Sequence, residues 1–227
     1  INLEKDKKRN EETIYELNKT NLKYERFNGI DGNKIDKYND TLCNRIPSIC
    51  KKKLTNKIIG CALSHIMLYK YIKQCDKNNF ALILEDDIEV INPELNYKKE
   101  INKIVKTYNK IKPNWEIIRL HSMGMNLGWT AAYIINLRYI YRFINTSLYY
   151  HIDLQHSFEN NIVNLNILFN TKDYKIIYKS PIYNLFFDNQ KIGFYLTQHV
   201  CKLNNVDINT SNLISFMIFI LLIRNCI

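Results

Sequence analysis

The sequence has few of the residues that define fibrous, disulfide-framed or zinc-binding proteins. It contains six glycines and four prolines in 227 residues, which excludes a collagen-like chain. Its six cysteines form no Cys-x-x-Cys pair and show no metal-ligand spacing with histidine, so we do not expect a zinc site. We expect free thiols in a reducing compartment, with a disulfide involving Cys43 and Cys50 as the alternative.

Targeting and membrane signals are also scarce. There is no initiator methionine and no signal peptide, and the first residues look like the end of a strand, as in a fragment or a trimmed domain. The most apolar run, Leu213 to Ile223, is 11 residues long and too short to span a bilayer. We expect this run to pack or to make peripheral membrane contact. The expected location is the cytoplasm, with the lumen of the endoplasmic reticulum as the alternative.

The charge does not indicate a nucleic-acid partner. The chain is globular in composition, with 46% hydrophobic and 24% charged residues and a net charge of +10. Lysine far outnumbers arginine, the lysines are scattered, and no arginine-rich recognition helix is present. We therefore expect no binding to nucleic acid.

The central feature is the stretch from Ala81 to Ile91. Its first four residues are apolar and predict a strand buried on both faces, which is typical of the centre of a parallel sheet. The run ends on Glu85, Asp86 and Asp87. Three adjacent carboxylates repel one another, so we expect a positive partner, with Mg²⁺ or Mn²⁺ as the obvious candidate. The alternative is a solvated acidic turn after a core strand.

The remaining chain alternates between helical and strand patterns. A charged run with Arg9 precedes the first expected helix, and Lys34 to Lys57 is polar and predicts a solvated loop or one that orders on binding. Helices are expected at Glu11–Asn18, Ile58–Cys75, Pro93–Ile111 and Leu137–Leu148, and further strands at Lys23–Phe27, Trp115–Leu120, Thr130–Ile135 and Tyr174–Tyr178. This order predicts a single α/β domain with a mostly parallel central sheet flanked by helices.

Two short stretches have residues suited to binding a ligand closely. Residues 28–32 place two glycines around Asp31, which favours a tight connection that approaches a ligand, or an ordinary turn. Gly60 begins a run of three small residues that lets a helix sit against another backbone. Ser64 and His65 are expected in the first turns of that helix, where free N–H groups favour phosphate. The alternative for His65 is a packed structural residue.

Taken in order, these stretches resemble glycosyltransferase family 25, the group that includes lipooligosaccharide galactosyltransferases and collagen hydroxylysine galactosyltransferases. The resemblance covers about residues 1 to 183. Its markers are Ile1-Asn2-Leu3 with Arg9, Phe27 through Asp31-Gly32, Ile59 to His65, Leu82 to Asp87, Trp115 with Ile117 to Leu120, Ala131 to Ile135, and Ile152-Asp153.

The resemblance implies a GT-A type nucleotide-sugar-binding domain over residues 1–183, followed by a C-terminal extension with a hydrophobic tail over 184–227. It also implies transfer of galactose or glucose from a UDP-sugar to a hydroxyl on a glycan or a hydroxylysine-containing protein. The transfer would be inverting and assisted by Mn²⁺, with Mg²⁺ as the alternative ion.

The same resemblance assigns roles to particular residues. Glu85, Asp86 and Asp87 would hold the metal, and Asp153 is the candidate base. The donor-binding candidates are Asn2, Leu3, Arg9, Asp31, Gly32, Gly60, Ser64 and His65. The family usually has glutamate where this chain has Ile58, so a catalytically inactive binding or adhesion module stays open as the alternative. The acidic triplet and the Ser64-His65 pair favour catalysis.

Overall fold

A computed structural model describes residues 1–75, 79–121, 131–148, 152, 156, 161–165 and 167–171. All of them belong to one compact unit, Ile1–Lys172. Asp153, the expected strand Tyr174–Tyr178, the domain boundary at residue 183 and the apolar run Leu213–Ile223 lie outside the described residues. Among the residues that are described, no helix combines the length and apolar character needed to cross a membrane.

The described helices and strands follow one another in a mixed α/β order. The helices are α1 (Lys7–Asn18), α2 (Ser48–Lys53), α3 (Asn56–Cys75), α4 (Tyr97–Ile111) and α5 (Ile140–Asn145), with 3-10 turns η1 (Gly32–Lys34), η2 (Thr41–Arg45) and η3 (Leu137–Tyr139). The strands are β1 (Phe80–Leu84), β2 (Ile88–Val90), β3 (Ile117–Arg119), β4 (Ala132–Asn136), β5 (Ile162–Asn164) and β6 (Phe169–Thr171).

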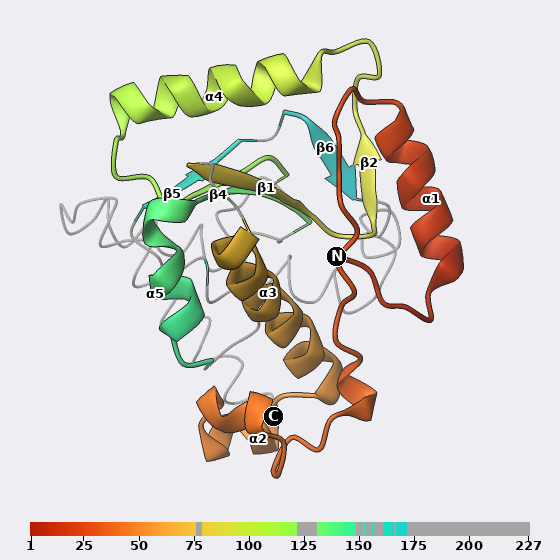
Figure 1. Ribbon diagram of the computed structural model, residues 1–227, viewed down its shortest axis with the longest axis vertical. Helices are drawn as coiled ribbons and strands as arrows, with labels where there is room; N and C mark the ends of the chain where they lie inside the picture. The colour runs from red at the N-terminus through yellow and green to blue at the C-terminus, as the bar shows by residue number, and fades with distance from the viewer. Residues whose placement is uncertain are drawn as a thin grey trace, which may run out of the picture. The chain divides into compact units, whose positions relative to one another are not determined.

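The main sheet has helices on both faces. Its strand order is β1-β4-β3-β5, and α4 lies on one face while α3 and α5 lie on the other (Figure 1). Alternate residues of each strand point to opposite faces. In β3 and β4, Ile118 and Ile134 belong to the core cluster that contains α4, whereas Ile117 and Ile135 belong to the cluster of α3 and α5. β1 lies at the edge of this sheet and only Ile83 among its five residues is fully buried, so the prediction of a strand at the centre of the sheet was wrong.

The prediction of an α/β class is confirmed, but the prediction of a mostly parallel sheet is not. β1 pairs with β4, and β4 with β3, in antiparallel register, as do β2 and β6; only β3 and β5 run parallel among the described strand pairs. The error has a physical reason. An apolar run reports that both faces are covered, and helices on two faces bury an antiparallel strand as completely as a parallel one.

The predicted helices are present with shifted ends. α1 starts four residues before the expected Glu11, and α3 ends at Cys75 as expected. α4 ends at Ile111 but begins at Tyr97 instead of Pro93, because the Asn96 side chain accepts a hydrogen bond from the Lys99 N–H at 3.0 Å and caps the helix there. The helix expected at Leu137–Leu148 is the turn η3 followed by the short α5.

Two other expectations for the N-terminal third were wrong. Lys23–Phe27 is not a strand, since the first four of its side chains are exposed, and a single parallel bridge joins Asn2 to Asn28 instead. The segment Lys34–Lys57 is not a solvated loop. It forms η2 and α2, and it buries Cys43 and Ile46 against α3 in a small separate core. A few buried apolar residues anchor an otherwise polar segment.

Gly60 brings α3 against the loop before η1. A Cβ atom built on Gly60 would lie 2.5 Å from the backbone nitrogen of Gly32 and 2.7 Å from the carbonyl oxygen of Ile30. The prediction that small residues let this helix sit against another backbone is thus confirmed at Gly60. The contact fixes how residues 30–32 meet the helix.

We expect Gly60→Ala to lower the free energy of unfolding. Overpacking costs about 1 to 3 kcal/mol, and the better helix propensity of alanine returns roughly 1 kcal/mol of it. Gly29→Ala is the matched control, because its added Cβ would meet only side-chain atoms, at 3.3 Å for Leu3 and 3.4 Å for Ser64. Urea unfolding of both variants measures the difference, and equal stabilities would contradict the close approach at Gly60.

Candidate functional site

A cavity of about 420 Å³ lies where the N-terminal segment, the loop before η1, α3 and the end of β1 meet. It is lined by both acidic and basic side chains. The lining residues are Ile1, Asn2, Leu3, Lys5, Asp6, Arg9, Gly29, Ile30, Asp31, Gly32, Asn33, Lys57, Cys61, Ser64, His65, Glu85 and Asp86. Such a concave site with a few convergent polar groups is the expected setting for a ligand.

The acidic turn after β1 supplies two of these residues, Glu85 and Asp86. The sheet holds the turn in place, because the Glu85 N–H donates to the Ala131 carbonyl at 2.8 Å. Asp87, by contrast, is 7% exposed and is not among the lining residues. Of the three predicted metal ligands, the structure therefore brings two to the cavity.

Asp86 is held by the N-terminal part of the chain. Its carboxylate accepts a hydrogen bond from the Asn2 side chain at 2.7 Å and pairs with the Arg9 guanidinium at 3.1 Å. Arg26 in turn donates to the Asn2 side-chain oxygen at 2.7 Å. The Thr13 hydroxyl also donates to the Asp86 backbone oxygen at 2.8 Å. Charge repulsion within the acidic turn is thus offset by Arg9 of α1, while Arg26 holds the Asn2 side chain that donates to Asp86.

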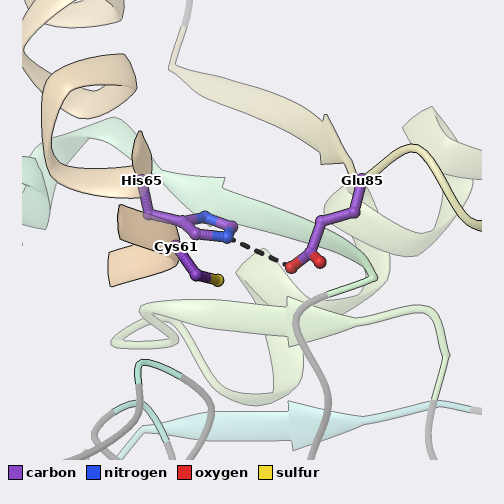
Figure 2. Close-up of side chains that lie close together, drawn as sticks. All are labelled: Cys61, His65 and Glu85. Atoms are coloured by element: carbon purple, nitrogen blue, oxygen red, sulfur yellow. Dashed lines mark hydrogen bonds and ion pairs between the residues drawn. The ribbon is translucent and has the colours of Figure 1, made fainter. Parts of the chain in front are cut away.

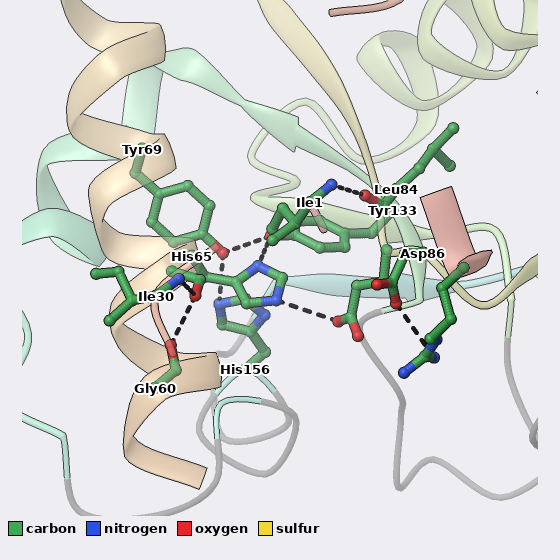
Figure 3. A network of polar contacts seen from close by, with 12 residues as sticks. Ile1, Ile30, Gly60, His65, Tyr69, Leu84, Asp86, Tyr133 and His156 are labelled. Carbon is green, nitrogen blue, oxygen red and sulfur yellow. Dashed lines mark hydrogen bonds and ion pairs between the residues drawn. The ribbon is translucent and has the colours of Figure 1, made fainter. Parts of the chain in front are cut away.

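His65 connects the cavity to the interior. It is 1% exposed, its Nε2 lies 3.1 Å from Glu85 Oε1, and its Nδ1 lies 2.7 Å from the Tyr133 hydroxyl (Figure 3). The prediction that Ser64 and His65 occupy the first turns of their helix was wrong. α3 begins at Asn56, so they are its ninth and tenth residues, and their backbone N–H groups are used inside the helix.

Ser64 joins α3 to the loop before η1. Its hydroxyl donates to the Gly60 carbonyl at 2.7 Å and accepts from the Ile30 N–H at 2.7 Å. The side chain is 3% exposed. Ser64 therefore shapes the cavity wall by holding the backbone of Ile30. Direct contact between Ser64 and a sugar donor stays a prediction.

Basic side chains stand around the same cavity. Lys5 pairs with Asp31 at 2.6 Å, and this ammonium group, together with the Asn33 N–H, lowers the pKa of Asp31. Lys57, in the first turn of α3, and Arg9 complete the set. The cavity is lined by three basic side chains and by four carboxylates, those of Asp6, Asp31, Glu85 and Asp86, and this mixture suits a ligand that carries negative charge and a positive counterion.

A neutral polar chain lies behind His65. The Tyr133 hydroxyl is 2.6 Å from that of Tyr69, which is 3.0 Å from Nε2 of His156 (Figure 3). Burial raises the pKa of Tyr133 well above 10 and lowers that of His156 well below 6.5. The nearby His65 and Arg119 side chains lower the His156 pKa further, against an opposing effect of Glu85. These groups are therefore uncharged near neutral pH.

The structure gathers most of the predicted donor-binding residues at the cavity. Asn2, Leu3, Arg9, Asp31, Gly32, Ser64 and His65 line it, Gly60 lies behind its wall, and Asp153 lies outside the described residues. Lys5, Lys57, Cys61 and Tyr133 were missed. For Cys61 the signal was present, because Cys61 and His65 are four residues apart and share one face of a helix. The statement that no cysteine has metal-ligand spacing with histidine was wrong.

We expect the buried histidines to make the fold sensitive to acid. Burial lowers the pKa of both His121 and His156, whereas in the unfolded chain both titrate near about 6.5. Above that pH both are neutral in either state. As the pH falls below this value, the unfolded chain binds protons at these histidines and the folded chain does not, so the free energy of unfolding decreases.

Urea midpoints measured between about pH 8 and about pH 5 test this expectation. His156→Gln and His121→Gln should each reduce the slope of stability against pH in that window. Unchanged slopes in both variants would contradict the assignment of buried neutral histidines.

Comparisons with known proteins agree with the resemblance noted in the sequence. Residues 1–127 match the model of glycosyltransferase family 25, described as an LPS biosynthesis protein. A protein of Acanthamoeba polyphaga mimivirus named "Procollagen lysyl hydroxylase and glycosyltransferase" is 25% identical in an alignment 144 residues long that covers 53% of this chain. A Haemophilus influenzae protein named "Putative glycosyltransferase" is 37% identical over 94 residues, or 40% of this chain.

The matched stretches cover 16% of the mimivirus protein and 32% of the Haemophilus protein, so this chain spans less than a third of either relative. The family match includes all the residues that line the cavity, the last of which is Asp86. The predicted family is confirmed. The chain belongs to glycosyltransferase family 25.

Proposed function

We propose that this protein transfers galactose or glucose from a UDP-sugar to a hydroxyl acceptor, with the cavity at the end of β1 as the donor site. One observation carries the proposal. Within the part of the chain that matches the glycosyltransferase family, Glu85 and Asp86 face the same cavity as Lys5, Arg9 and Lys57. A nucleoside diphosphate needs cations for its phosphates and hydrogen-bond acceptors for its sugar hydroxyls.

The cationic side chains are placed to take the diphosphate. Arg9 is 44% exposed and Lys5 is 50% exposed, so both reach solvent at the cavity although each is already paired with a carboxylate. Phosphate oxygens would compete for these pairs, which are weak at an exposed site. The chain's own role in this step is to bind and orient the donor, with Lys57 as a third cation at the start of α3.

The donor set of the acidic turn fits a hard divalent cation. Glu85 and Asp86 offer carboxylate oxygens to the cavity, which are the ligands that Mn²⁺ and Mg²⁺ accept, and both side chains would hold the ion. When bound, such an ion would supply positive charge against the developing negative charge of the leaving diphosphate. Asp87 is buried behind this pair and would support the turn.

The acceptor and the stereochemistry are part of the same proposal. An inverting transfer needs a base for the proton of the acceptor hydroxyl, and Asp153 stays the candidate. The name of the mimivirus relative includes procollagen and the family description includes LPS, so a hydroxylysine-containing protein and a glycan are the two acceptor classes to test.

One observation favours a second candidate, a binding module without catalysis. Both carboxylates that the acidic turn brings to the cavity already have protein partners: Glu85 contacts His65, and Asp86 contacts Arg9 and Asn2. A module that binds a sugar or a nucleotide without metal needs no further cation. Metal dependence of UDP binding distinguishes the two.

We expect Asp86→Asn to weaken UDP binding in the presence of Mn²⁺. Losing a charged ligand costs about 1.5 to 3 kcal/mol, or roughly ten- to a hundredfold in affinity. Isothermal titration with UDP, with and without Mn²⁺, measures the change. Glu94→Gln is the matched control, since this exposed carboxyl is near in sequence and is not among the cavity residues.

Unchanged Mn²⁺-dependent affinity in Asp86→Asn would remove the acidic turn from the donor site. UDP binding that is equally tight without metal, together with no release of UDP from UDP-galactose or UDP-glucose in the presence of either acceptor class, would establish the binding module instead.

A further inference from the structure

Cys61, His65 and Glu85 bring three different metal-binding side chains together. One ligand atom from each lies within 4.8 Å of the other two, and Figure 2 shows the sulfur, the imidazole and the carboxylate converging. Cys61 and His65 lie one turn apart on α3, while Glu85 comes from the end of β1. The rigid helix and the hydrogen-bonded strand end therefore fix two sides of the cluster.

The hydrogen bonds behind His65 orient its ring for a metal. With a metal on Nε2, Nδ1 carries the proton and donates it to the Tyr133 oxygen, 2.7 Å away. Tyr133 then donates to Tyr69 at 2.6 Å, and Tyr69 donates to Nε2 of His156 at 3.0 Å. Each of these donors has one acceptor, and ligating histidines commonly have such a partner on the second nitrogen.

The cluster is open on the cavity side. Cys61, His65 and Glu85 all line the cavity, and the Glu85 side chain is 25% exposed. An ion can enter from solvent, and a fourth coordination position faces the cavity. Three protein ligands with one open position distinguish such a site from closed structural zinc sites, which have four protein ligands.

We propose that Cys61 Sγ, His65 Nε2 and the Glu85 carboxylate form a site for Zn²⁺, separate from the oxygen-only pair Glu85 and Asp86. Thiolate and imidazole select borderline-soft ions, which Mn²⁺ and Mg²⁺ are not. Tetrahedral coordination puts donor atoms roughly 3.3 to 3.8 Å apart. The His65 Nε2 to Glu85 Oε1 distance is already 3.1 Å, and any separation near 4.8 Å would close by about 1 Å through side-chain rotation. The thiol proton is released to solvent on binding.

The two metal sites share Glu85, which gives the zinc site a regulatory consequence. Zn²⁺ on Cys61 and His65 draws the Glu85 carboxylate away from an ion held with Asp86. Zn²⁺ should therefore oppose Mn²⁺-dependent UDP binding. This consequence alone rests on the proposed function, whereas the zinc site itself does not.

Titration of the 227-residue chain with Co²⁺ tests the site without any nucleotide. Cobalt replaces zinc in such sites and reports a thiolate ligand by an intense sulfur-to-metal charge-transfer band. We expect one equivalent of Co²⁺ to produce this band, and Zn²⁺ to abolish it. Cys61→Ser should lose the band, and Cys75→Ser, a matched control at the exposed end of the same helix, should retain it. No band, or a band that survives in Cys61→Ser, overturns the proposal.

A measurement on the unaltered chain covers the case in which Cys61→Ser fails to fold. Zn²⁺ should slow alkylation of Cys61 by iodoacetamide and leave the rate at Cys75 unchanged, as followed by peptide mass spectrometry. Equal protection of both cysteines, or none, overturns the site. Tyr133→Phe keeps the ligands but removes the partner of Nδ1, and it should weaken Zn²⁺ about ten- to a hundredfold.

UDP titration and Co²⁺ titration distinguish failure of the donor site from failure of the zinc site. If the Co²⁺ band appears and UDP fails to bind, the zinc site stands and the donor site fails. If UDP binds with Mn²⁺ and no Co²⁺ band appears, the donor site stands and the zinc site fails.

Discussion

Burial of the central strands on both faces is the constraint on which the rest of this structure depends. All five residues of β4 are buried, and its apolar neighbours divide between the core under α4 and the core over α3 and α5. Because neither face of the sheet is free, β1 has one register against β4, and that register fixes where its chain leaves the sheet. The acidic turn emerges at that point, beside α3, which brings Glu85 to His65.

Sequence patterns predicted where the buried elements lie better than how they are connected. The apolar runs in β1, β3 and β4 and the periodic run in α3 were placed within a few residues. The direction of the strands was not, because burial is the same for parallel and antiparallel neighbours once helices cover both faces. The segment from Lys34 to Lys57 was missed for the opposite reason. Only a few of its residues, such as Cys43 and Ile46, are buried, so the polar majority hid a folded segment.

At the site, the sequence predicted residues that are adjacent in the chain, but it did not predict the contacts between residues that only the fold brings together. The acidic triplet and the glycine pair around Asp31 are adjacent in sequence and were found. The partners of Asp86 are Asn2 and Arg9, and the partner of His65 is Tyr133. In each pair the two residues are more than sixty positions apart in the sequence. No period or spacing links such residues, since a sheet and a helix bring them together. Within the triplet, the burial of Asp87 depends on the turn geometry and not on its identity.

The contact of Gly60 with residues 30–32 has a consequence for how the cavity treats its ligand. There the wall consists of peptide groups pressed on a helix backbone and tied by Ser64, with no side chain between them. Side chains change rotamer in nanoseconds, whereas a wall of this kind moves only if the loop or helix moves as a unit. A ligand entering there therefore meets a surface that is already ordered, and it loses little conformational entropy in fitting against it. The long, flexible side chains of Lys5 and Arg9 line the same cavity, so we expect these two side chains to adapt to different ligands and the backbone wall to reject ligands by size.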